Sequence, residues 1–220
     1  MGMDVYGRNP KQNRTKESFP VYSKYDKMEF KDKWKELDKD KKLQEQYWKE
    51  QTDYEDGNVG YYFRNNCWRW RPLWNYCYAV ADDIIEDNLQ VKEYETDDDG
   101  ETDFENYRWV KAKYDDGHGN SGAGLNDKYA KLLGNRLMEC IADGSTIEYQ
   151  AEYMDCLDNL PDDVCLRCNG NNRGNNKMKD CKMCNKTGKS RNFSKSYSFD
   201  VDNVEDFAKF CLESGGFEIC

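Results

Sequence analysis

The fold is decided by residues 59–87, VGYYFRNNCWRWRPLWNYCYAVADDIIED, which concentrate aromatic and aliphatic side chains. From Trp68 to Arg71 aromatic and basic residues alternate, which predicts a strand with the tryptophans on one face and the arginines on the other. Pro72 suits the first position of a helix. The apolar residues after it recur every three or four positions, at Leu73, Cys77, Val80 and Ile84. We therefore expect a strand up to Arg71 and a buried helix over residues 72–87.

Shorter patterns on both sides of this stretch predict further helices and strands. Apolar periodicity favours helices from about Asn126, over residues 146–159, and after an N-cap at Asp202 or Asn203. Strands are expected at residues 3–7, 107–110, 193–199 and 217–220. The sequence thus predicts an α+β fold, a compact helix-rich domain with a small sheet and an aromatic core.

A highly charged segment precedes the aromatic stretch. Residues 8–27 are polar and without clear periodicity, and residues 29–51 carry a narrow apolar seam that includes Trp34. The seam predicts one inserted surface helix over residues 29–51, which covers the core or binds a partner. Trp34 is accordingly a candidate partner-contact or core aromatic.

Composition limits the classes of partner. The chain has 220 residues, of which 37% are apolar, 14% aromatic and 35% charged, and its net charge is −10. The aromatic content favours a folded protein, and the acidic field should repel nucleic acid and anionic membranes. We find no secretory signal or apolar run of bilayer length, which predicts a cytoplasmic protein with reduced thiols and no membrane partner.

The sharpest chemical pattern is a pair of Cys-x2-Cys motifs, Cys165–Cys168 and Cys181–Cys184. Two such motifs at this separation predict a single Zn²⁺ bound by four thiolates. A closed thiolate shell leaves no position for water, so this zinc would be structural. We expect a zinc knuckle at residues 161–190, inserted into a main domain of residues 1–160 and 190–220.

The knuckle is basic although the chain is acidic. Its candidate contacts for an anion or nucleic acid are Arg167, Arg173, Lys177, Lys179, Lys182, Lys186, Lys189 and Arg191. Nucleic acid is therefore an alternative partner, through residues 165–195. The other interpretation is that these cations neutralise the thiolates and stay solvated. Trp68 and Trp70 allow two interpretations as well, a stacking platform for nucleic acid or a buried pair.

Catalytic patterns are weak. His118 is the single histidine, which excludes a histidine-based catalytic zinc site. The glycine-rich segment at residues 116–124 does not match a phosphate-binding loop and is expected to be a connector. Carboxylate-dependent chemistry on nucleotides stays open as a second alternative. The sequence favours a non-enzymatic protein without settling the point.

Two resemblances add to this interpretation. Cys165-Leu-Arg-Cys-Asn-Gly170 and Cys181-Lys-Met-Cys-Asn-Lys-Thr-Gly188 resemble the Cys-x2-Cys-x-Gly-x-Gly repeats of DnaJ-type zinc regions, with Asn172 and Lys186 replacing glycines. The segments MGMDVYG at the start, YFRNNCW followed by RPLW in the middle, and GGFEIC at the end resemble an uncharacterised family of small tailed-bacteriophage proteins. That resemblance implies action inside an infected bacterium. We therefore expect a protein that binds a host protein, plausibly to inhibit an antiviral defence or a host machine.

Overall fold

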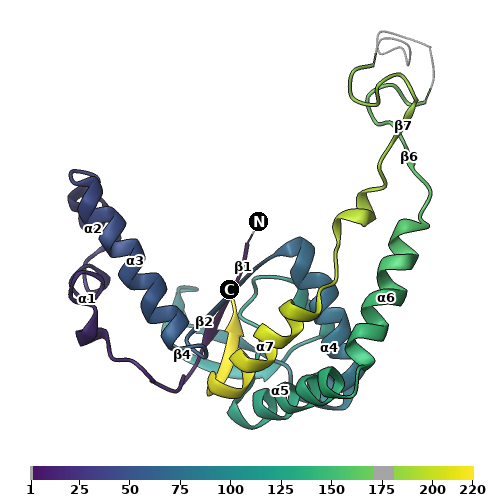
Figure 1. The fold of residues 1–220 in the computed structure, drawn as a ribbon. Coiled ribbons are helices and arrows are strands. Elements are labelled where there is room, and N and C mark those ends of the chain that lie inside the picture. Colours follow the sequence, from purple (N-terminus) through teal and green to yellow (C-terminus); the bar gives the residue numbers. More distant parts are fainter. Residues whose placement is uncertain (1, 171–180) are drawn as a thin grey trace.

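The computed structural model describes residues 2–170 and 181–220. Its main feature is a six-stranded antiparallel sheet with the strand order β2-β1-β8-β5-β3-β4. The strands are β1 (Gly2–Gly7), β2 (Tyr62–Asn66), β3 (Gln90–Thr96), β4 (Thr102–Lys111), β5 (Gly124–Asn126) and β8 (Gly216–Ile219). The combination of this sheet with helices confirms the predicted α+β fold with an aromatic core (Figure 1).

Helices cover one face of the sheet. These are α4 (Cys67–Asn88), α5 (Asp127–Ala142) and α7 (Val201–Glu213), and α6 (Ser145–Asp158) packs beside α5. The strands contribute Val5, Leu125, Phe217 and Ile219 to the same fully buried core. Because side chains alternate along a strand, Tyr6 and Glu218 point to the opposite face, where Arg8 stacks 3.5 Å above the Trp109 ring.

The centre of the core is a pair of tryptophans on α4. The Trp70 and Trp74 rings stack with centroids 5.6 Å apart, and Phe207 of α7 meets Trp70 edge-on at 5.4 Å. The Trp70 indole N–H donates to the Gly117 carbonyl at 2.8 Å. A Cβ at Gly117 would lie 2.3 Å from the Trp74 side chain, so only glycine allows the backbone at this position to lie so close to the tryptophan.

The strand expected at residues 68–71 is wrong. α4 begins at Cys67, because the Asn66 side chain accepts hydrogen bonds from the N–H groups of Trp68 and Arg69 and caps the helix. Pro72 therefore lies inside the helix and not at its first position. Four alternating residues fit a strand, but Trp70 and Trp74 share a helix face at the spacing i, i+4.

Three other expectations need correction. Residues 193–199 form no strand but a short 3₁₀ helix, η4 (Phe193–Ser196), followed by an extended segment, and Asp200 caps α7 in place of Asp202 or Asn203. Residues 29–51 contain two helices, α2 (Phe30–Leu37) and the start of α3 (Lys41–Gly57). The break follows from Asp40, whose carboxylate caps α3 through the N–H groups of Lys42 and Leu43.

The N-terminal helices have their own apolar cluster. Residues 8–27, expected to be irregular, include η1 (Lys16–Ser18) and α1 (Pro20–Asp26). α1, α2 and α3 stand to one side of the sheet (Figure 1) and enclose a cluster of mostly tyrosine side chains. Its buried members are Phe19, Tyr22, Tyr25, Leu37, Tyr47 and Tyr54. The division into a main domain, an inserted charged helix and a knuckle insertion stays a prediction.

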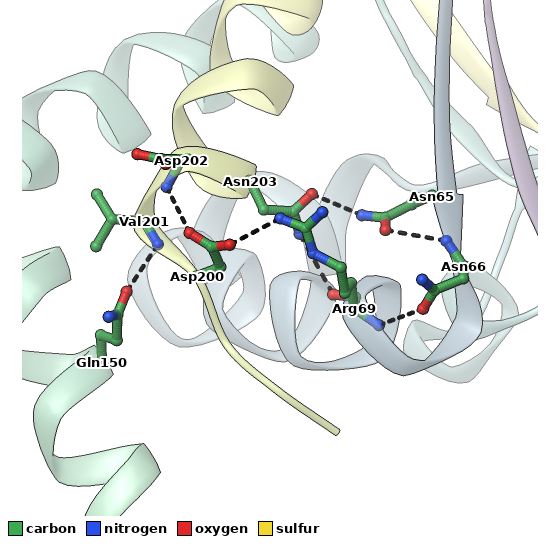
Figure 2. A network of polar contacts seen from close by, with 8 residues as sticks. All are labelled: Asn65, Asn66, Arg69, Gln150, Asp200, Val201, Asp202 and Asn203. Atoms are coloured by element: carbon green, nitrogen blue, oxygen red, sulfur yellow. Dashed lines mark hydrogen bonds and ion pairs between the residues drawn. The ribbon is translucent and has the colours of Figure 1, made fainter. Parts of the chain in front are cut away.

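A polar network ties the end of the sheet to three helices (Figure 2). The Asn65 amide of β2 donates to Asn203 Oδ1 of α7 at 2.8 Å, and both side chains are buried. Arg69 of α4 pairs with Asp200 at 2.9 Å, and the Gln150 amide oxygen of α6 accepts from the Val201 N–H at 2.8 Å. The network fixes the start of α7 against both α4 and α6.

We expect Asn203→Ala to lower the free energy of unfolding by about 1–3 kcal/mol, since it leaves the buried Asn65 amide without its acceptor. Chemical denaturation followed by circular dichroism measures this. The matched control is Asn135→Ala on the exposed face of α5, which should change stability by less than about 0.5 kcal/mol. Equal stability of the two variants would contradict the role given to the network.

Candidate metal centre

A slender arm extends from the body of the molecule after α6 (Figure 1). Its two strands, β6 (Asp163–Val164) and β7 (Lys189–Ser190), pair antiparallel and lead to the cysteine-rich knuckle. At the root of the arm the Phe193 N–H donates to Asp163 at 3.0 Å. The Lys195 ammonium donates to the Asp158 carbonyl at 3.0 Å and so joins the returning chain to the end of α6.

The four cysteines of the knuckle lie together at the end of this arm. Cys165, Cys168, Cys181 and Cys184 are all buried, and their sulfurs lie within 4.8 Å of one another. The Cys165–Cys181 and Cys168–Cys184 sulfurs are 3.8 and 3.7 Å apart. A tetrahedral ion bound at about 2.3 Å requires sulfur–sulfur distances of about 3.8 Å. The arrangement can therefore hold one tetrahedral metal ion.

Tight turns after each Cys-x2-Cys motif close this cage. Asn169 and Gly170 after the first motif have positive φ values of 52° and 64°. After the second motif Lys186 has a φ of 70°, at the position where DnaJ-type repeats carry glycine. This left-handed conformation is unfavourable for lysine. The turn nevertheless keeps the conformation that glycine would adopt there, although the sequence departs from the glycine pattern. The Gly188 N–H then donates to the Cys184 sulfur at 3.3 Å.

The thiols influence one another's protonation. Burial raises the pKa of Cys168 to about 12. Burial acts in the same sense on Cys184, but the Gly188 N–H and the neighbouring thiols together lower the pKa of Cys184 to about 6. Proton sharing of this kind marks sulfurs held close together, and a bound cation would replace these protons.

Five of the predicted basic contacts lie in the described part of the arm and are exposed: Arg167, Lys182, Lys186, Lys189 and Arg191. The other three, Arg173, Lys177 and Lys179, lie outside the described residues. The sequence analysis missed two apolar side chains between the cysteines, Leu166 and Met183, which are 84% and 57% exposed. The sequence did contain a signal for their exposure, because the two residues between the cysteines of a Cys-x2-Cys turn point away from the sulfurs.

The tryptophans do not form a binding platform together. Trp70 is completely buried, so it belongs to the core. Trp68 is half-buried between Phe193 and Tyr197, with ring centroids 4.9 Å from each. Trp34 is half-buried in the N-terminal cluster. Its ring centroid lies 5.5 Å from that of Trp48, and Trp48 is 46% exposed. Trp68 therefore supports the root of the arm.

His118 ends η2 (Tyr114–His118) and is half-buried against the Tyr114 ring. Burial lowers its pKa; Arg71 acts in the same direction and Asp115 in the opposite one. In the described part of the chain, the knuckle cysteines are the single group of three or more His, Cys, Asp or Glu side chains close enough to share an ion. The structure thus does not assemble a second metal centre around His118 from these residues.

No protein-family model, curated protein or solved structure matches this chain. Within the described residues, none of the helices combines the length and apolar character needed to cross a bilayer.

Cys181→Ser should abolish metal binding, because three thiolates and a hydroxyl hold a soft tetrahedral ion much more weakly than four thiolates. We expect one ion per chain in the unchanged protein and none in the variant, measured by native mass spectrometry. Cys156→Ser, which alters an exposed cysteine of α6, is the control and should retain the ion. A Cys181→Ser protein that keeps its ion would refute the assigned ligands.

The pKa of His118 should lie below its usual value of 6.5, because burial disfavours the imidazolium. The unfolded chain then binds the proton more readily, so this contribution to stability is complete above pH 6.5 and is lost as pH falls through the folded value. NMR titration of the single imidazole gives the pKa. Denaturation of wild type and His118→Gln across this pH range gives the linkage, and parallel stability curves would contradict it.

Proposed function

We propose that this chain is a non-enzymatic interaction protein with a structural Zn²⁺, and that its knuckle docks on an acidic surface of a partner protein. The observation that supports this proposal lies at the end of the arm. There Leu166 and Met183 are exposed to solvent beside the buried four-cysteine cage. Exposed apolar side chains on a rigid support are typical of contacts completed by a partner.

The charges around this apolar pair indicate what kind of partner fits. Arg167, Lys182 and Lys186 flank Leu166 and Met183, and they form no ion pair with any described residue. Cations around an apolar centre match a partner with an apolar depression and an acidic rim. The acidic remainder of the chain cannot supply that surface from the same molecule, because the arm holds the knuckle away from the body (Figure 1).

Zinc fits the cage better than the hard ions Mg²⁺ and Ca²⁺. Four thiolates select soft or borderline cations over Mg²⁺ and Ca²⁺, and tetrahedral geometry with sulfur ligands is typical of zinc. With all four positions filled by protein, such an ion supplies rigidity and no open site for substrate. The role proposed for zinc is to hold Leu166 and Met183 in a fixed orientation.

The resemblance to tailed-bacteriophage proteins supports a bacterial host protein as the partner. In that setting docking would inhibit an antiviral defence or redirect a host machine. The second candidate function is nucleic-acid binding by the same exposed cations, which would show a steep fall of affinity with salt. The two bulky apolar side chains that the knuckle exposes favour the protein partner.

The test is affinity capture from bacterial lysate with the zinc-loaded protein, followed by binding measurements on the captured partner. Leu166→Ser/Met183→Ser should weaken binding by roughly tenfold or more, since buried apolar anchors carry most of an interface's energy. Ile147→Ser is the matched control, because Ile147 is 62% exposed on α6 away from the knuckle. A partner held equally by both variants would show that another surface docks. Recovery of nucleic acid with salt-sensitive binding would favour the alternative.

A further inference from the structure

A hollow of ≈ 590 Å³ lies at the root of the arm, away from the knuckle. Four separate segments line it: the first turns of α4, the end of η2, the second half of α6, and the returning segment at residues 194–197. Its size is that of a site for a small organic molecule. Neither the metal cage nor the docking surface uses it.

One side of the hollow carries a guanidinium without a counter-ion. Arg71 donates to the Tyr197 hydroxyl at 2.8 Å, and no described carboxylate lies within ion-pair distance of it. Some other arginines of the chain are paired, as Arg69 is with Asp200 at 2.9 Å and Arg108 with Glu93 at 2.6 Å. In an acidic protein, a guanidinium left unpaired in a hollow is a candidate anion-binding group.

His118 adds a hydrogen-bonding nitrogen to the same hollow. Its Nδ1 is inaccessible and has no partner among the described residues, so Nε2 is the nitrogen available to a ligand. Burial lowers the pKa of the imidazole, and in its Nε2–H tautomer Nε2 donates. Asp115 from η2 and Asn75 from α4 complete the polar lining. Asp115 can accept from an N–H or amino group, so the polar groups suit a ligand with both donors and an anion.

Apart from Ser194, the remaining lining is apolar and aromatic. Pro72 and Leu157 are buried, and the Tyr153 and Tyr197 rings are half-buried. The Tyr153 hydroxyl is occupied by the Tyr197 carbonyl, to which it donates at 3.0 Å. Tyr153 therefore offers its ring to a ligand, and aromatic rings favour planar partners.

We propose that this hollow binds a mononucleotide, with the phosphate on Arg71, the base against the tyrosine rings, and base donors toward Asp115. A planar heterocycle with amino or N–H donors and one anionic group is complementary to Arg71, Asp115 and the tyrosine rings. We infer binding alone and assign no reaction to this lining. It is independent of the docking proposed for the knuckle.

The test is a titration of the full, zinc-loaded chain with AMP, GMP, CMP and UMP. The imidazole of His118, the single histidine, gives one NMR signal to follow, and calorimetry gives the affinity. At least one nucleotide should shift this signal and saturate with a Kd below about 1 mM. Adenosine and inorganic phosphate, each alone, should bind at least tenfold more weakly than the matching nucleotide, because each lacks half of the recognised chemistry.

Arg71→Ala should weaken nucleotide binding about tenfold or more, because it removes a charge-assisted contact. Arg64→Ala is the matched control, an exposed arginine of β2 outside the hollow, and should bind as wild type does. Arg71 is also exposed, so its replacement should not unfold the chain. The proposal is overturned if no nucleotide moves the His118 signal at about 5 mM. It also fails if Arg71→Ala binds like wild type, or if phosphate alone or adenosine alone binds as tightly as the nucleotide.

Discussion

The structure depends on one buried aromatic contact between α4 and α7 beneath the sheet. Phe207 meets Trp70 edge-on, and Phe63 of β2 lies 5.2 Å from Phe207. Phe217 of β8 lies 5.7 Å from the same ring. Each such side chain contributes roughly 2–3 kcal/mol through burial, and paired rings add about 0.5–1.5 kcal/mol. The contact thus joins segments from the middle and the end of the chain, and holds β2 and β8 against the helices.

Local signals explain which parts of the fold were predictable. The helices α5 and α6 and the strands β1 and β8 show periodicity within a single segment, so the sequence predicts them closely. The pattern at residues 68–71 is too short to distinguish the helical period from the strand period. The Asn66 cap at the start of α4 decides that this segment is helical. The same holds at Asp40, where a capping carboxylate ends one expected helix and begins another. Side-chain caps decided both boundaries where periodicity alone misled.

The two candidate sites differ in predictability for a related reason. The cysteine cage is built by two short motifs in one local loop, so spacing alone predicts which sulfurs meet. The hollow at the root of the arm takes side chains from four segments. Arg71 meets Tyr197 and lies near His118 only after α4, η2 and α6 have packed. Sequence analysis interpreted Arg71 as one end of a strand and His118 as an isolated loop residue, and had no basis for joining them.

The arm connects these two sites through a short segment. Residues 191–197 return from the knuckle, and Tyr197 and Ser194 line the hollow while Lys195 holds the end of α6. Trp68 packs against Phe193 and Tyr197 and so ties this segment to α4. A ligand in the hollow would contact both α4 and the returning segment, and would therefore bridge the body and the arm.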